Sequence, residues 1–198
     1  MVFSTDKRVR VGNLRPELMY KAWTVSRRIR AVNPDAVFIA GTDDIGAFLS
    51  VDAPIIHHSD ATFAVMRNYY PGFSGLSRYG VRLANQCAQR SISKANLNIY
   101  PSHWAADSAL RDYHADPASV HVVPYGSNID PAPTTEQAFA ARNRDRCKLL
   151  YIGGVWARKR GDIAVQIIET LVERGIDAHL DVIGRWPVDH PRVHRWGF

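Results

Sequence analysis

The chain has 198 residues, of which 46% are hydrophobic and 22% charged, and these proportions indicate a folded globular protein rather than a disordered one. Its formal net charge of +6 favours an anionic partner. The basic residues are scattered and are not interleaved with aromatic ones, so nucleic acid is the weaker choice. A phosphorylated small molecule or an acidic lipid headgroup fits better.

Cysteine usage and hydropathy bear on the compartment. Cys87 and Cys147 stand far apart in dissimilar contexts and match neither a disulfide framework nor a metal site, which is typical of a reducing compartment. The sequence has no apolar stretch long enough to span a bilayer and no apolar core of a signal peptide near Met1. We therefore expect a cytoplasmic protein.

In the first part of the chain, apolar spacing alternates between helical and extended patterns, with turn-forming residues in between. The expected elements are, in order, a helix capped by Asn13 and ended at Asn33, a strand over 36–40, a short helix through Leu49, a strand over 54–58, a loop-like aromatic stretch over 63–73, a helix over 74–95, a strand over 97–100, a helix from Ser102 to Tyr113 and a strand over 120–123. The helical faces expected to be buried carry Leu18, Ala22, Val25 and Ile29, then Leu76, Tyr79, Leu83 and Cys87, then Trp104, Ala105, Ser108 and Ala109. Strands that alternate with helices predict a parallel sheet.

A breaker cluster over 124–128, followed by the proline-rich stretch 130–133, is the best linker candidate. We therefore expect an N-terminal domain over 1–126, a linker over 127–145 and a second domain over 146–198. The elements expected after the breaker cluster are a small helix over 135–142, a strand from Cys147, a helix with Ile163, Ile167, Leu171 and Val172 on its apolar face that ends at Gly175, a strand over 178–183 and a third strand over 193–196. So few elements cannot cover both faces of a parallel sheet.

A basic turn stands between the strand from Cys147 and the helix that follows it. Arg158 and Lys159 come just before Gly161, where the unpaired backbone N–H groups and the positive dipole of the helix N-terminus gather. The spacing predicts a site for a phosphate or diphosphate, although it is neither a P-loop nor a dinucleotide fingerprint. The alternative is a solvated corner that binds nothing.

Four stretches in order resemble the family 4 (group 1) glycosyltransferases. They are Pro-Ile-Ile-His-His-Ser-Asp and the residues after it over 54–73, Tyr-Pro-Ser-His-Trp-Ala-Ala over 100–106, Val-Val-Pro-Tyr-Gly-Ser-Asn over 122–128 and Gly-Gly-Val-Trp-Ala-Arg-Lys-Arg-Gly-Asp over 153–162. The resemblance implies a GT-B fold, in which two Rossmann-like domains, both incomplete in this chain, bind a nucleotide-sugar donor and an acceptor. It also implies transfer with retention of configuration, without an obligatory metal or other cofactor.

The resemblance carries over to named positions. It implies catalytic roles for His58 and Asp60, and it implies a donor diphosphate site made of Gly153, Gly154, Arg158, Lys159 and Gly161. It places His57, Tyr69, Tyr70 and Gly126 at the acceptor or in the cleft. The alternatives are that one of the two histidines packs on the sheet, that Asp60 only caps a turn, and that the tyrosines belong to the core.

The expected partners are a nucleotide-sugar donor and a saccharide or lipid-linked acceptor, with no nucleic acid and with a peripheral contact at the inner face of a membrane. The family's first strand and its later carboxylate pair are not found in the sequence, so we expect a fragment with little or no activity by itself. Two other functions stay open: a sugar-nucleotide epimerase of the same fold, and a non-enzymatic module that binds a phosphorylated ligand.

Overall fold

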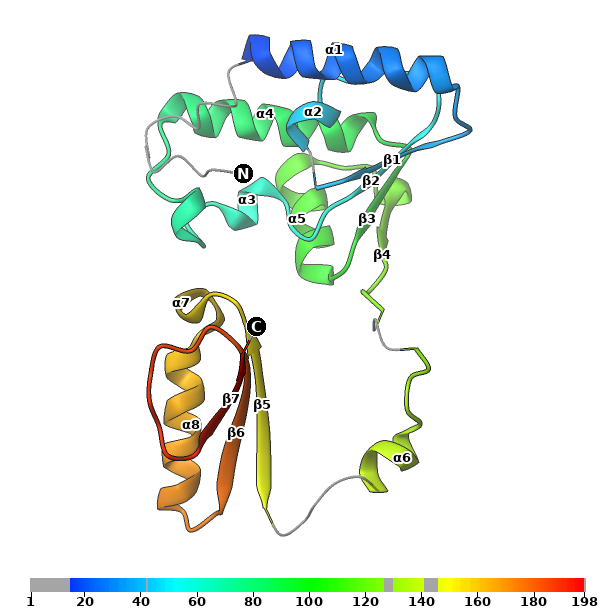
Figure 1. Ribbon diagram of the computed structural model, residues 1–198. Helices are drawn as coiled ribbons and strands as arrows, with labels where there is room; N and C mark the ends of the chain where they lie inside the picture. Colours follow the sequence, from blue (N-terminus) through cyan, green and yellow to red (C-terminus); the bar gives the residue numbers. More distant parts are fainter. Residues whose placement is uncertain (1–14, 42, 127–129, 141–145, 198) are drawn as a thin grey trace. The chain divides into compact units, whose positions relative to one another are not determined.

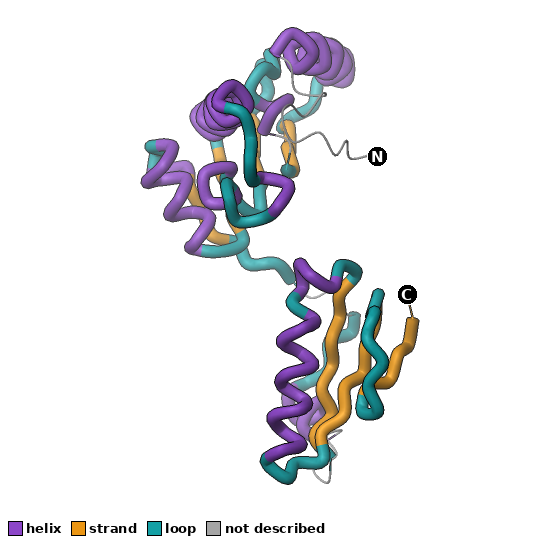
Figure 2. The backbone as a smooth tube through the Cα atoms, turned by 90° about the vertical axis from the view of Figure 1, so that its left-hand side faces the viewer, coloured by secondary structure: helices purple, strands orange, loops and turns teal. Residues whose placement is uncertain are grey.

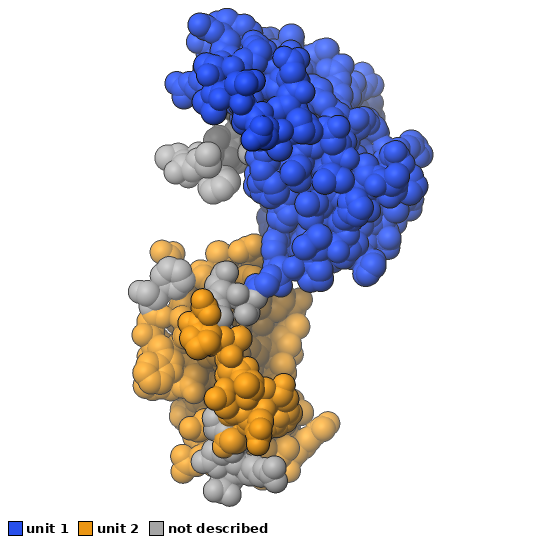
Figure 3. All heavy atoms as spheres, turned by 90° about the vertical axis from the view of Figure 1, so that its right-hand side faces the viewer, with its two compact units in different colours: residues 1–126 blue, residues 127–198 orange. Residues whose placement is uncertain are grey.

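The computed structural model describes residues 15–41, 43–126, 130–140 and 146–197. The chain divides into two compact units, residues 1–126 (unit 1) and residues 127–198 (unit 2), which Figure 3 shows in different colours. Each unit packs helices against a parallel sheet, so the expected α/β class with two Rossmann-like parallel-sheet domains is confirmed. Among the described helices, none combines the length and the apolar character needed to cross a membrane.

Unit 1 contains a four-stranded sheet in the order β1-β2-β3-β4, with all neighbouring strands parallel (Figure 1). Its elements are α1 (Arg15–Val32), β1 (Val37–Ala40), α2 (Asp43–Gly46), β2 (Ile55–His58), α3 (Phe63–Met66), the 3₁₀ turn η1 (Pro71–Phe73), α4 (Arg78–Lys94), β3 (Leu97–Tyr100), α5 (His103–Tyr113), the 3₁₀ turn η2 (Pro117–Ser119) and β4 (Val120–Val122). Each strand coincides with a short apolar run between turn residues, as the sequence predicts.

The helices of unit 1 pack on one face of its sheet. Ile39 and Ile55 point from β1 and β2 into a core shared with α1, and Tyr100 points from β3 into a core shared with α4 and α5. Because side chains alternate along a strand, the neighbours of these residues face the other way. Phe38 and Leu97 on that second face are exposed. The helix-facing side of the sheet therefore carries the core of unit 1.

The long helix of unit 1 begins later than expected. Instead of starting at Ser74, α4 starts after Ser77, whose Oγ accepts a hydrogen bond from the backbone N–H of Gly80 at 3.0 Å. Such a cap satisfies one of the free N–H groups in the first turn and sets where the helix begins. Tyr79, which the sequence places on the buried face, is largely exposed.

Smaller differences occur elsewhere in unit 1. Trp104, expected to pack on the sheet, is half exposed, whereas Ala105, Ser108 and Ala109 of the same expected face are buried. The expected Ser102 cap is present. The short helix expected through Leu49 ends earlier, with α2. The stretch 63–73, expected to be loop-like, contains the single turns α3 and η1. Asn13 lies outside the described residues.

Unit 2 contains a three-stranded parallel sheet in the order β5-β6-β7. Its elements are α6 (Thr135–Ala140), β5 (Cys147–Gly153), α7 (Trp156–Lys159), α8 (Gly161–Glu173), β6 (Ala178–Gly184) and β7 (Val193–Gly197). Figure 2 shows α8 lying along one side of these strands. Leu150 and Ile152, whose side chains point to the other side of the sheet, are exposed, as expected when a single helix packs on a sheet.

The face that α8 buries differs from the expected one. Ile163 and Ile167 are 40% and 46% exposed, whereas Ile168 is 0% exposed and packs against the sheet. Of the expected face, Val172 does pack against this core, where Ala164 and Val165 join it, so apolar residues occur on both sides of the helix. Periodicity alone therefore could not select the inward face.

Candidate functional site

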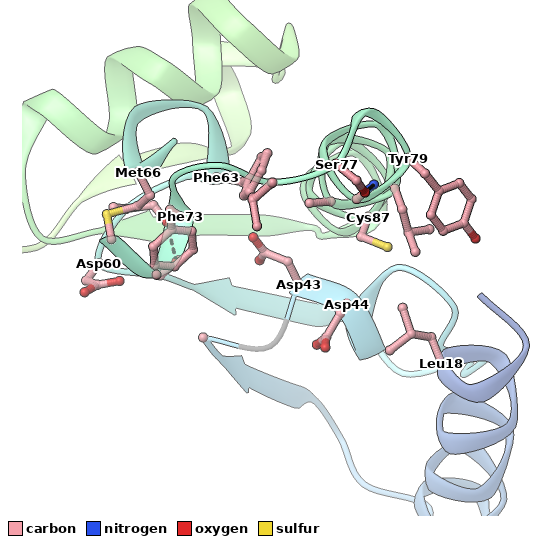
Figure 4. Close-up of a pocket in the computed structure, with 18 residues that line it drawn as sticks. Leu18, Asp43, Asp44, Asp60, Phe63, Met66, Phe73, Ser77, Tyr79 and Cys87 are labelled. Carbon is pink, nitrogen blue, oxygen red and sulfur yellow. Dashed lines mark hydrogen bonds between the residues drawn. The ribbon is translucent and has the colours of Figure 1, made fainter. Parts of the chain in front are cut away.

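A cavity of about 310 Å³ lies in unit 1 beyond the carboxyl ends of β1 and β2 (Figure 4). In open parallel α/β sheets, ligands bind at this edge. The segments after the two strands contribute three carboxylates, Asp43 and Asp44 from the first turn of α2 and Asp60 from the loop after β2. The rings of Phe63, Phe73 and Tyr79 also line the cavity, together with apolar side chains of α1 and α4. Its residues therefore offer hydrogen-bond acceptors on one side and apolar surface on the other.

Asp43 is the carboxylate of the cavity that has a buried partner. Its Oδ1 lies 2.6 Å from Nε2 of His57. The His57 side chain is only 1% exposed, whereas that of Asp43 is 23% exposed. The register between β2 and β3 sets His57 beside Asn98, and Nδ1 of the ring lies 3.2 Å from Oδ1 of Asn98. The ring is thus held between two side chains, one of which lines the cavity.

The hydrogen bonds around Asn98 define the direction of this network. Its amide nitrogen donates to the carbonyl oxygen of Ile92 at 3.1 Å and to Oγ of Ser119 at 3.3 Å, while Ser119 donates to the carbonyl of Asp116. The amide oxygen of Asn98 is therefore the atom that faces His57, and it can only accept. Nδ1 of His57 must donate to it, and so carries a proton.

The proton on Nδ1 of His57 constrains the contact between the other ring nitrogen and Asp43. A carboxylate cannot donate a hydrogen bond, so a contact of 2.6 Å between Nε2 and Oδ1 requires a second proton between them. Oδ1 is occupied by the contact with the ring, which leaves Oδ2 of Asp43 as the acceptor available to a ligand in the cavity.

The apolar surroundings of this pair raise the pKa values of neighbouring groups. Burial, followed by the negative charge of Asp43, raises the pKa of the Tyr100 hydroxyl, and the rings of Tyr100 and His57 form a T-shaped pair with centroids 6.3 Å apart. Burial also raises the pKa of the Cys87 thiol to about 11, with the charge of Asp44 as the second cause. Cys87 therefore lines the cavity as a neutral thiol.

The structure separates the two residues that the resemblance made catalytic. Asp60 lines the cavity, but His58 does not. The alternation along β2 turns His58 to the opposite face of the sheet. There its ring packs against the rings of Phe38 and Tyr125, with centroids 5.9 Å and 5.6 Å away. His57 lies behind Asp43 instead of in an open cleft, so its ring has almost no surface for a substrate.

The other expected acceptor residues also lie away from the cavity lining. Tyr69 is exposed, and its ring centroid lies 4.8 Å from that of Tyr70 and 6.1 Å from that of Trp104. Tyr70 is half-buried. Gly126 is exposed, and a Cβ added there would meet open space, so no backbone constraint requires glycine at this position.

In unit 2 the carboxyl ends of β5 and β6 approach each other closely through two glycines. Gly184 has a φ of +129°, and a Cβ on it would lie 2.2 Å from the carbonyl oxygen of Gly153. Gly161 at the start of α8 is similarly constrained, because a Cβ there would lie 2.1 Å from the ring of Trp156. Packing alone therefore explains why Gly161 and Gly184 are glycines. A Cβ on Gly153 would lie 2.7 Å from the hydroxyl of Tyr151. Gly154 follows β5 and is exposed.

The two cations expected at the diphosphate lie in the single turn of α7. Arg158 and Lys159 are exposed, and neither side chain forms an ion pair with a residue that the structure describes. The N-terminus of α8 that follows is partly occupied by Asp162. The Arg160 guanidinium lies 2.8 Å from the Asp162 carboxylate and, as the first cause, lowers the pKa of that carboxyl. The corner therefore offers two uncompensated cations beside a neutral pair.

Sequence reasoning did not single out Asp43 and Asn98, and it expected His57 at the acceptor or in the cleft, with packing of one histidine on the sheet as the alternative. A signal was present, since strand alternation puts His57 on the same face as Ile55, which any buried strand would turn toward the helices. The partners could not be read in the same way, because Asp43 and Asn98 are separated from His57 by 14 and 41 residues. Within the described ranges, no group of three His, Cys, Asp or Glu side chains could hold a metal ion.

No protein family model matches the chain, and no curated protein matches it. Among solved structures it is similar to the UDP-N-acetylglucosamine 2-epimerase from Rickettsia bellii, with 9% identity and a TM-score of 0.42 over 98% of this chain and 52% of that one. It is also similar to the glycosyltransferase SnogD from Streptomyces nogalater, with 13% identity and a TM-score of 0.42 over 91% of this chain and 50% of that one. The chain thus spans about half the length of each. At these scores neither similarity bears on its function, and membership of glycosyltransferase family 4 stays a prediction.

Proposed function

We propose that this chain is part of a metal-independent, retaining glycosyltransferase that takes a sugar from a nucleoside-diphosphate donor. The observation that carries the proposal is the corner between β5 and α8. Arg158 and Lys159 are exposed there and have no anionic partner among the described residues. A pair of uncompensated cations beside a helix N-terminus favours the binding of a phosphate or diphosphate.

The chemistry of the donor gives these cations a role. When the bond to the sugar breaks, negative charge grows on the departing nucleoside diphosphate. Without a metal ion, side-chain cations and backbone N–H groups must stabilise that charge, and each well-placed donor contributes roughly 3–4 kcal/mol. In this proposal Arg158 and Lys159 supply that stabilisation. Asp162 does not oppose it, because Arg160 neutralises the carboxylate.

The acceptor of the proposed reaction is a saccharide or a lipid-linked saccharide, and the cavity of unit 1 suits its chemistry. Oδ2 of Asp43 and the carboxylate of Asp60 can accept hydrogen bonds from sugar hydroxyls, while Phe63 and Phe73 offer apolar surface to the ring. In this role His57 contacts no substrate. It holds the Asp43 carboxylate in one orientation.

The first test is calorimetric titration of UDP and GDP into the chain, with EDTA present. The native chain should bind at least one of them, and Arg158→Ala/Lys159→Ala should weaken binding by about tenfold or more, as expected for two charge-assisted contacts. Arg174→Ala/Lys148→Ala is the matched control, since it removes the same charge from exposed positions at the other end of α8 and β5. This control should bind like the native chain.

The outcomes separate the open functions. Equal binding by the native chain and the Arg158/Lys159 variant would remove the basis of the proposal. Where binding depends on the corner, incubation with UDP-N-acetylglucosamine and a saccharide acceptor follows. A transferred sugar supports the glycosyltransferase, and an epimerised donor would instead indicate an epimerase. Binding without any product is expected both of a partial enzyme with little activity and of a module that only holds a phosphorylated ligand.

A further inference from the structure

The outward face of α1 exposes three large apolar side chains close together. Met19, Tyr20 and Trp23 are 51%, 67% and 52% exposed, and the rings of Tyr20 and Trp23 stack with centroids 6.1 Å apart. The inward face of the same helix is used in the core, where Leu18 and Ala22 are fully buried. Figure 1 shows α1 running along the outside of unit 1. Packing within the unit therefore does not explain the exposed aromatic stripe.

Cations flank this stripe on both sides. At 100° per residue, Tyr20, Trp23 and Arg27 share the middle of the outward face. Arg30 lies on one flank of this face and Lys21 and Arg28 lie on the other, whereas Arg15 falls on the side of Leu18 and Ala22. Against these five basic residues the helix has a single acid, Glu17.

The contacts of these cations leave most of their charge uncompensated. Glu17 pairs with Lys21 at 2.6 Å, and the guanidinium of Arg27 lies over the Trp23 ring at 5.1 Å. Arg30 donates to the carbonyl oxygen of Ser50, which carries no net charge. Apart from Glu17, no acid pairs with a basic residue of α1 in the described part of unit 1. The face is thus aromatic at its centre and strongly positive around it.

We propose that the outward face of α1 docks the protein on an anionic membrane surface. Tyr and Trp favour the boundary between water and lipid, since their rings are apolar and their O–H and N–H groups are polar. Lys and Arg beside them meet acidic headgroups, and each such charge strengthens binding about fivefold. A nucleic acid would use the charge but not Met19, and an ordinary protein partner would not need cations on both flanks. This inference does not depend on the proposed function.

The test is co-sedimentation of the whole chain with vesicles of phosphatidylcholine alone, or of phosphatidylcholine and phosphatidylglycerol in equal parts, at low and moderate salt. The native chain should bind only the anionic vesicles, and more weakly as salt rises. Arg27→Glu/Arg28→Glu should weaken binding by about 25-fold or more, because two attractive charges become repulsive. Tyr20→Ser/Trp23→Ser should weaken it about tenfold.

Two matched controls come from the same chain. Tyr69 and Trp104 form a second Tyr–Trp pair, also with ring centroids 6.1 Å apart and with exposures of 65% and 49%, so Tyr69→Ser/Trp104→Ser removes the same groups at another place. Lys148→Glu/Arg174→Glu makes the same change of charge in unit 2. Both controls should bind vesicles within twofold of the native chain. Circular dichroism verifies that every variant is folded.

Three results would overturn the proposal. The first is no binding to anionic vesicles at low salt. The second is a loss in the controls equal to that in the α1 variants, since the overall charge of +6 would then explain the binding. The third is that the chain binds polyglutamate or a single-stranded oligonucleotide through α1 but does not bind vesicles. That result would assign this face to an acidic macromolecule.

Discussion

Replacing Asp43 with alanine should destabilise unit 1, because the change takes one of two hydrogen-bond partners from the buried ring of His57. A buried polar group left without a partner costs about 1–3 kcal/mol. Since Asp43 itself is 23% exposed, water entering from the cavity would offset part of that loss. The expected decrease in the free energy of unfolding is therefore about 1–2 kcal/mol. Asp43→Asn should cost less than about 1 kcal/mol, because the amide can donate to a bare Nε2.

The assay is hydrogen exchange followed by mass spectrometry on peptides that cover β2 and β3, because these report the stability of unit 1 separately from unit 2. Asp60→Ala is the control. Asp60 lines the same cavity but forms no hydrogen bond within the described residues, so its loss should change stability by less than about 0.5 kcal/mol. The reasoning about the network fails if Asp43→Ala and Asp60→Ala have the same effect, or if Asp43→Asn costs as much as Asp43→Ala. Nitrogen NMR of the His57 ring adds an independent check, since Nδ1 should carry a proton.

Three further predictions concern packing and the buried thiol. Ile168→Ala should lower the stability of unit 2 by about 2–5 kcal/mol, whereas Ile167→Ala should change it by less than about 1 kcal/mol. Hydrogen exchange in β5 and β6 measures both effects. A larger loss for Ile167→Ala than for Ile168→Ala would mean that α8 is rotated about its axis. Gly184→Ala should cost at least about 2 kcal/mol, since its Cβ would strike the Gly153 carbonyl at a φ of +129°, and an unchanged thermal midpoint for unit 2 would contradict that approach. Burial raises the pKa of Cys87 from its ordinary 9.0 to about 11, so iodoacetamide at pH 8 should modify it far more slowly in the folded chain than in urea. The contribution of the neutral Cys87 thiol to the stability of the folded state is fully present below pH 9 and is lost as the pH rises toward about 11. Equal alkylation rates in the folded chain and in urea would refute the burial of Cys87.

The sequence predicted most of the strands and the class of fold because these depend on local patterns. Short segments rich in apolar residues and bounded by turn-forming residues became strands, as at Leu97–Tyr100 and Cys147–Gly153. Helices and strands alternate along the chain, and short connections between them leave a parallel sheet as the natural arrangement. A local helix cap was also predicted correctly, since the side chain of Ser102 accepts a hydrogen bond from the N–H of Ala105 as expected. Such features involve residues that are near one another in the chain.

The tertiary structure decided which side of each element is used. α8 has apolar residues on both sides, and only its contacts with the sheet select Ile168 over Ile167. The roles of the neighbouring histidines were decided in the same way. His57 is buried and His58 is not, because β2 turns one of them toward the helices and the other away from them.

Length, apolar runs and caps thus determined by themselves that this chain forms helices alternating with parallel strands. Apolar spacing and caps involve residues that are near one another in the chain, so they can be recognised without the tertiary structure. The cavity, and the contact between Asp43 and the ring of His57 within unit 1, depend instead on strand register and on loops distant in the sequence. Such pairings have no local signature, because a hydrogen bond across 14 or 41 residues exists only once the sheet has brought its members together.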